Sequence, residues 1–158
     1  MEYRQFEKQD SNEVHKLAFD SWKFTYKKIY PPDFIEKFVN QNYDPKKLGA
    51  LIPQIKSGKM FFYVVIDKPH VVGFCHIGDR GSGMELFRIY LKPNYIGQGI
   101  GEKLLSFGES FVKSKGLHKY FCFVHKKNKI GIKFYLKNNF KHIQEKDEAN
   151  EWYMEKKL

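Results

Sequence analysis

The sequence predicts an α/β protein with one mixed, mostly antiparallel central sheet and flanking helices. Up to Gly58 the apolar residues recur mainly with helical period, and three apolar, β-branched and aromatic runs then follow one another. After them, helical and strand patterns alternate to the end of the chain. The expected order of elements is therefore β-ααα-βββ-α-β-α-ββ. At 158 residues the chain is most simply a single domain, 1–158, large enough for a substantial core.

The N-terminal part is expected to hold one short strand, Tyr3–Phe6, and three helices. Each helix opens at an aspartate in front of an apolar stripe, at Asp10, Asp33 and Asp44. Asp10 and Glu13 also have the spacing of a capping box. Pro53 lies inside the third helical pattern, and it should kink or shorten that helix because proline lacks a backbone N–H.

The remaining elements follow from apolar runs bounded by turn residues. The expected strands are Met60–Ile66, Val71–Ile77, Met84–Leu91, Tyr120–Val124, Phe140–Gln144 and Trp152–Lys156. A helix should run from Ile100 to just before Gly116, and a shorter one should cover Lys129–Lys137. Because Tyr120–Val124 follows a crossover helix, it should lie parallel to Met84–Leu91.

Composition excludes several classes of protein. No run approaches the roughly 20 apolar residues of a membrane span, and the charged N-terminus has no apolar region of the signal-peptide type. We therefore expect a cytoplasmic protein that does not use a membrane. Cys75 and Cys122 lie in predicted strands with another strand between them, so buried free thiols are expected. No metal is expected, because no His or Cys cluster has zinc-ligand spacing.

The formal charge of +10 has three explanations. They are nucleic-acid binding, attraction of a polyanionic cofactor, and a lysine-rich solvated surface. The lysines are scattered along the chain in single residues and short pairs, without a long basic arm. This distribution favours the solvated surface, and nucleic acid is not expected as a partner.

A glycine-rich loop after the third central strand is the first candidate binding site. Gly97, Gly99 and Gly101 alternate where the loop becomes a helix, so the backbone can come close to a ligand. The free N–H groups at the helix start and the helix dipole together favour an anion. A Walker loop would need glycine at Glu102, and the dinucleotide fingerprint would need glycine at Leu104. The loop therefore predicts a phosphate site of another kind.

Two local motifs resemble those of the GNAT superfamily of acyl-CoA-dependent N-acyltransferases. The first comprises Tyr90–Pro93 and the loop Ile96–Gly101, with Ile96 where the family usually has arginine or glutamine. The second is Asn128–Phe140, with Asn139 in place of the usual glycine. The expected order of elements is also that of the family, so the resemblance covers nearly the whole chain. The segment Ala18–Phe38 is further similar to PaiA-type polyamine acetyltransferases.

The resemblance implies acetyl-CoA as the cofactor. Backbone groups of Ile89, Tyr90 and Leu91 would pair with its pantetheine arm, as if it were an added strand. The pyrophosphate would bind to Ile96, Gly97, Gln98, Gly99, Ile100, Gly101 and Glu102. Asn128 and Gly131 would contact the far side of the cofactor.

Two residues are candidates for the chemistry. By the resemblance, Tyr135 is the general acid that protonates the leaving thiolate, although it could instead be a packing tyrosine. Glu85 lies six residues before Leu91, where some members of the family have a catalytic glutamate. As an acidic residue in an apolar strand, on the same face as Phe87, Ile89 and Leu91, it would have a raised pKa suited to a base. A surface carboxylate paired with a lysine is the alternative.

The acyl acceptor is expected to be a small-molecule amine. By the resemblance, the first two helices and the late strands would form the acceptor site, and Trp22, Tyr26, Glu85 and His125 are the candidate substrate residues. An aromatic wall with carboxylates suits a cation, although the aromatic residues could equally belong to the core. The resulting hypothesis is an acetyl-CoA-dependent N-acetyltransferase that acts on a primary amine, polyamines first, by direct attack on the thioester. Alternatives are a protein or peptide acetyltransferase acting on N-termini or lysines, and a non-catalytic CoA- or nucleic-acid-binding module. A homodimer is left open, because members of the family often pair.

Overall fold

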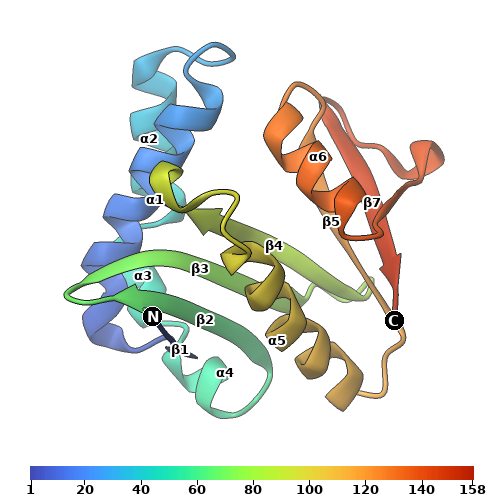
Figure 1. Ribbon diagram of the computed structural model, residues 1–158, viewed down its shortest axis with the longest axis horizontal. Coiled ribbons are helices and arrows are strands. Elements are labelled where there is room, and N and C mark those ends of the chain that lie inside the picture. The colour runs from blue at the N-terminus through green and yellow to red at the C-terminus, as the bar shows by residue number, and fades with distance from the viewer.

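A computed structural model describes residues 1–158 and shows a seven-stranded sheet with helices on both faces (Figure 1). The strands are β1 (Glu2–Gln5), β2 (Met60–Asp67), β3 (His70–Asp79), β4 (Met84–Leu91), β5 (Lys119–His125), β6 (Lys141–His142) and β7 (Glu151–Lys157). Their order in the sheet is β1-β2-β3-β4-β5-β7-β6, and only β4 and β5 are parallel. The predicted mixed, mostly antiparallel fold is confirmed, as is the parallel pairing after the crossover helix.

The helices number six where sequence predicted five. They are α1 (Ser11–Tyr26), α2 (Pro32–Asn42), α3 (Pro45–Gly49), α4 (Ile52–Lys56), α5 (Ile100–Ser114) and α6 (Lys129–Lys137). The expected third helix is divided into α3 and α4, because Pro53 occupies the first turn of α4. Proline is tolerated there, where its missing N–H would be unpaired anyway, but not inside a continuous helix.

The start of α1 also differs in detail from the expectation. Asp10 does not cap α1 with its side chain. Its carboxylate instead accepts hydrogen bonds from both terminal nitrogens of Arg4, each at 2.8 Å, and from the backbone N–H of Glu7 at 2.8 Å. The capping box therefore lies one turn earlier, between Glu7 and Asp10.

The two faces of the sheet have separate cores. Along β2, Phe61 and Val65 pack in the core that contains α5, whereas Phe62 and Val64 pack in the core that contains α1. This alternation is the period of two that a strand buried on both faces requires. Helices α1 to α4 thus cover one face of the sheet, and α5 covers the other (Figure 1).

Near the C-terminus one expected strand is shorter than predicted. Of Phe140–Gln144, only Lys141–His142 forms β6, and the chain then turns into a short 3₁₀ helix, Gln144–Lys146. Asn139 ends α6 with φ of 67°, in the left-handed conformation that asparagine tolerates best after glycine. Its replacement of the family's usual glycine is therefore compatible with the turn.

The parallel pair β4 and β5 is in register at one position. Glu85 lies opposite Phe121, and no further residue pair is in register between the two strands. Towards Leu91 the strands separate, and β5 continues beside β7 instead (Figure 1). Strand backbone groups in this gap have lost the neighbour that would normally pair with them.

A bulge interrupts the regular pairing of β4. His76 on β3 lies opposite Arg88, but the next residue, Ile77, lies opposite Leu86. Phe87 is therefore the extra residue of a β-bulge. Because a bulge inserts one residue, it exchanges the faces on which the following side chains lie.

The bulge changes the position expected for Glu85. Ile89 and Leu91 pack on the α5 side of the sheet, whereas Tyr90 packs on the α1 side. Glu85 precedes the bulge and lies on the side of Tyr90. The expectation that Glu85 shares a face with Ile89 and Leu91 is wrong, because simple alternation across an unrecognised bulge gives the opposite answer.

Candidate active site

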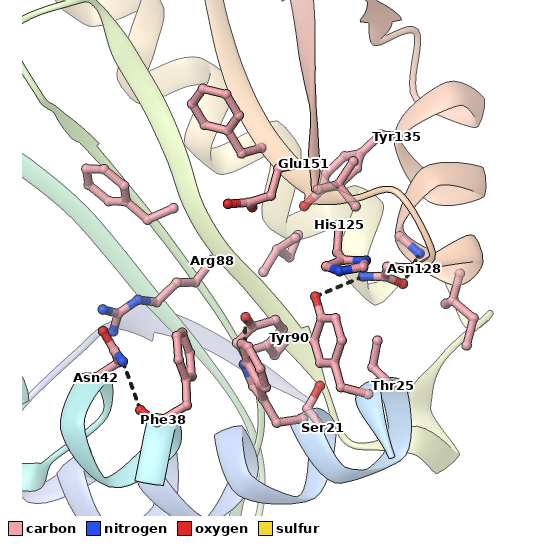
Figure 2. A pocket seen from close by; sticks show the side chains of 18 of the residues that line it. Ser21, Thr25, Phe38, Asn42, Arg88, Tyr90, His125, Asn128, Tyr135 and Glu151 are labelled. Atoms are coloured by element: carbon pink, nitrogen blue, oxygen red, sulfur yellow. Dashed lines mark hydrogen bonds between the residues drawn. The ribbon is translucent and has the colours of Figure 1, made fainter. Parts of the chain in front are cut away.

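A cavity of about 760 Å³ opens where β4 and β5 separate, and residues from both faces of the sheet line it (Figure 2). The predicted residues that it brings together are Trp22, Tyr26, Glu85, Ile89, Tyr90, Leu91, Ile96, Gly101, His125, Asn128, Gly131 and Tyr135. The other predicted residues lie outside the lining, in the loop and first turn next to it, and are Gly97, Gln98, Gly99, Ile100 and Glu102.

The glycine loop offers backbone groups rather than side chains. Gly97 and Gly99 have φ of 82° and 79°, values that strain any residue with a Cβ. Gly99 precedes the first residue of α5, and no side chain caps that helix. The N–H groups of the first turn are therefore free to bind an anion. Gly101 has a different role, because a Cβ there would lie 2.9 Å from the Phe134 ring.

The side chains of the loop are turned away or already paired. Ile100 is buried in the core. Gln98 donates to the carbonyl oxygen of Asn94 at 2.8 Å, and Glu102 accepts from Lys137 at 2.9 Å. That hydrogen bond lowers the pKa of Glu102. Any phosphate bound here would therefore be held by backbone amides and the helix dipole.

Asn128 fixes the start of α6 and connects it to α1. Its Oδ1 accepts from the Gly131 N–H at 2.9 Å, as an N-cap, and its Nδ2 donates to the Tyr26 hydroxyl at 3.3 Å. Gly131 has no room for a side chain, because a Cβ would lie 2.7 Å from Nδ2 of Asn128. Figure 2 shows Asn128 beside His125, and both residues line the cavity.

Tyr135 points from α6 into the cavity and is buried (Figure 2). Burial raises the pKa of its phenol well above the usual value, and the neighbouring Cys122 thiol acts in the same direction. The phenol is therefore fully protonated at neutral pH. A buried, protonated hydroxyl next to the gap between the strands can donate a proton to a leaving group there.

Glu85 is buried and lines the cavity from β4. Burial raises the pKa of its carboxyl group, and the ion pair with Arg80, 3.0 Å from Nε to Oε2, lowers it in part. Glu151 and Glu148 raise it further. The pKa of Glu151 is itself raised, first by burial and then by Glu148. A carboxylate with a raised pKa is a suitable proton acceptor near neutral pH.

Glu148 and Glu151 were not among the residues predicted from sequence. Both line the cavity, from the turn before β7 and from its first residue. The turn has no motif, and its contribution depends on β7 pairing with β5 beside the cavity. The signal in the sequence was that two glutamates precede the last predicted strand, Glu151 directly and Glu148 by four residues.

The two histidines that line the cavity, His76 and His125, are less suited than the carboxylates to act as bases. Nδ1 of His125 accepts the backbone N–H of Lys127 at 3.1 Å, so in neutral imidazole the proton is on Nε2. Its pKa is lowered by burial and by Lys127 and Lys126, so the neutral form dominates. His76 is buried, and burial together with Arg88 and Arg80 lowers its pKa to about 3.

The wall formed by α1 and α2 is aromatic and polar at once. Trp22 Nε1 donates to the Tyr90 hydroxyl at 3.1 Å, and Tyr43 donates to the same oxygen at 3.0 Å. Tyr90 therefore presents its side chain to the wall formed by α1 and α2. Trp22 also stacks on Phe38 at 4.1 Å between ring centroids. Tyr43 could not be predicted from the sequence, because it belongs to no motif and follows a polar segment at the end of α2.

No group of three or more His, Cys, Asp or Glu side chains could hold a metal ion. Cys75 and Cys122 are both buried and free, as predicted. None of the helices is both long and apolar enough to cross a membrane.

Several known proteins are similar to this chain in sequence and in fold. Residues 13–140 match the acetyltransferase (GNAT) family. Spermidine N(1)-acetyltransferase from Thermoplasma acidophilum is 33% identical over 158 residues, which cover 99% of this chain and 97% of that protein. The crystal structure of PaiA N-acetyltransferase from the same organism, in complex with coenzyme A, has a TM-score of 0.93 at 32% identity and covers 99% of this chain and 98% of its own.

A more distant structure shows the shared fold alone. Ribosomal-protein-alanine N-acetyltransferase from Brucella melitensis matches with a TM-score of 0.75 at 17% identity, and the match covers 100% of both chains. The two motifs, the fold, the family match over most of the sequence and the full-length relative all agree. This chain is a member of the acetyltransferase (GNAT) family.

Proposed function

We propose that the protein transfers the acetyl group of acetyl-CoA to a primary amine, with polyamines as the main class of acceptor. The single observation that supports this most is the cavity between β4 and β5, which a protonated tyrosine and carboxylates with raised pKa line and which the glycine loop borders. Identity of 33% to a spermidine acetyltransferase supports the choice of acceptor. Carboxylates opposite aromatic rings also suit an ammonium group.

The residues fit acetyl-CoA at three places. The uncapped first turn of α5 and the open space around Gly97 and Gly99 suit a pyrophosphate. Backbone groups of Ile89 to Leu91, where β4 has separated from β5, suit an extended amide-containing arm. The net charge of +10 attracts the polyanion over longer distances. Acetyl-CoA supplies the activated acetyl group for the reaction.

Two side chains would move the protons. Glu85 accepts a proton from the ammonium group of the acceptor, so that the free amine can attack the thioester carbon. A C–N bond forms and the C–S bond breaks in this direct transfer. Tyr135 donates its proton to the leaving sulfur and is reprotonated by solvent. Both groups line the same cavity, Glu85 from β4 and Tyr135 from α6.

A panel of acceptors tests the proposed function. We expect free CoA thiol to appear when acetyl-CoA is mixed with putrescine, spermidine or spermine, with a higher kcat/KM than for aminoglycosides or short peptides with free N-termini. Turnover with peptides alone would overturn the polyamine assignment. Absence of both turnover and CoA binding would overturn the acetyltransferase proposal as a whole.

The affinity for CoA should be weak for this fold, because Ile96 replaces an arginine or glutamine side chain. Ile96 is 42% exposed at the edge of the cavity. We expect Ile96→Arg to tighten CoA binding about two- to fivefold, the usual effect of an exposed ion pair, in calorimetric titrations at low salt. Leu136→Arg adds the same charge at an exposed site that does not line the cavity. Equal tightening by both variants would contradict a specific effect at the loop.

We further infer that the protein acts in the cytoplasm, where acetyl-CoA is available. Pairing into a homodimer stays a prediction, which sedimentation of the purified protein can test.

A further inference from the structure

Every buried polar side-chain atom without a hydrogen-bond partner lies in one place. These atoms are both ring nitrogens of His76 and Nη1 of Arg88. The two residues lie opposite one another on β3 and β4, and both line the cavity. An unsatisfied buried polar group costs about 1–3 kcal/mol. Such costs concentrated at one wall of a binding cavity indicate a site for a ligand.

The Arg88 guanidinium has no anion near it. It lies over the Tyr43 ring, 4.4 Å from the centroid, and it forms none of the ion pairs of the molecule. In Figure 2 its side chain runs from β4 towards Asn42 and Phe38 of α2. Arg88 therefore presents an uncompensated positive charge to the wall of the cavity that faces α2.

His76 adds hydrogen-bonding capacity but no charge. It stacks on Phe62 at 4.8 Å between centroids and meets the edge of Phe87 at 5.0 Å. Its pKa of about 3 keeps the ring neutral, so it offers one N–H donor and one acceptor. The unpartnered groups at this wall are thus one cation and one neutral ring, and the other nearby guanidinium, that of Arg80, is already paired with Glu85.

Three carboxylates form a second group in the lining. Glu148 and Glu151 are close enough to raise the pKa of Glu85, and of the three only Glu85 is paired with a cation, Arg80. Glu85 and Arg88 lie three residues apart on β4, a span of roughly 10 Å or less in a strand. The cavity is therefore polarised, with carboxylates at one end and a free guanidinium at the other. A polyamine complements only the first end, because every nitrogen that it presents is cationic.

We propose that Arg88 and His76 form a subsite for a carboxylate, so that the enzyme also acetylates amines that have a carboxylate a few methylene groups away. The attacked amine lies at the Glu85 end, and the carboxylate pairs with the guanidinium, which can form two parallel hydrogen bonds to it. This inference rests on the proposed amine acetylation but not on polyamines being the main acceptor.

Ornithine and putrescine test the subsite, because they differ only by the carboxylate. We expect the wild-type protein to acetylate ornithine at its side-chain amine. In Arg88→Met the ratio of kcat/KM for ornithine to that for putrescine should fall about 10- to 100-fold, the usual worth of a charge-assisted pair. Arg88→Lys should restore part of the ratio, because it keeps the charge but loses the planar fork. Methionine fills similar space over Tyr43, and thermal unfolding checks that the variant is folded.

Arg80→Met is the matched control, since it removes another arginine from the same cavity. It should affect both substrates alike through Glu85 and leave the ratio near that of the wild type. An unchanged ratio in Arg88→Met, or acetylation of putrescine without ornithine, would overturn the subsite. If neither amine is acetylated, the proposed function fails. The subsite is then judged by the ratio of the two dissociation constants, measured by calorimetry with CoA present, which should shift in the same direction.

Discussion

Replacing Tyr135 by phenylalanine is expected to lower kcat by about 10²- to 10⁴-fold, the usual contribution of a positioned proton donor. The ring would still fill its place in the core, so folding should be nearly unaffected. The dissociation constant of CoA should also change little, because the proposed role of the hydroxyl is to protonate a leaving group rather than to hold the cofactor. Steady-state kinetics with spermidine and a calorimetric CoA titration measure the two quantities separately.

Tyr153→Phe is the matched control for this experiment. Tyr153 is also buried, but its hydroxyl donates to Glu155 at 3.0 Å and does not line the cavity. The same substitution there should leave kcat within a few-fold of the wild type. Tyr135 would have only a packing role if its phenylalanine variant kept the wild-type kcat.

Replacing Glu85 by glutamine is expected to lower kcat/KM by a similar factor of about 10² to 10⁴, because an amide cannot accept the proton of an ammonium group. The wild-type rate should rise with pH through the pKa of Glu85, since only the carboxylate is a base. Burial raises that pKa above the usual value for glutamate, so this acidic limb lies at higher pH than for an exposed carboxylate. In Glu85→Gln the limb should disappear from the residual activity.

The variant Arg80→Met tests whether Glu85 is the titrating group, because the direction in which it should move the acidic limb is known. The ion pair with Arg80 lowers the pKa of Glu85, so its removal should raise the pKa and move the acidic limb to higher pH. Arg80 is mostly exposed, with 66% of its side chain accessible, so salt should screen the ion pair and reduce this difference. A limb that stays in place, or moves to lower pH, would exclude Glu85 as the titrating base.

Elements with strong local signals could be predicted closely from sequence. Met84–Leu91 and Lys129–Lys137 form β4 and α6 with the predicted bounds. The first is a mainly apolar run between turn residues, and the second begins at an Asn128 cap and ends near Asn139. Residues of the two motifs meet at the cavity because β4 and β5 pair in parallel. That pairing could be predicted from the crossover helix alone.

What could not be predicted depends on contacts between distant segments. The bulge at Phe87 appears only in the register of β4 against β3, and it decides on which face Glu85 lies. Arg88 and His76 are unremarkable in their own strands, and their missing partners are evident only when every neighbour is placed. Glu151 lines the cavity because β7 pairs with β5, and these two strands are far apart in the sequence. Local periodicity contains no information on these three arrangements.

Direct transfer of the acetyl group from acetyl-CoA to an amine can be tested by following both products of one reaction. The protein is incubated with acetyl-CoA and spermidine, and the mixture is analysed by mass spectrometry of the small molecules and of the intact chain. We predict that spermidine gains one acetyl group in equal amount to the CoA released, and that without spermidine neither free CoA nor an acetylated chain accumulates. Unmodified spermidine, or an acetyl group retained on the protein as an intermediate, would contradict the account.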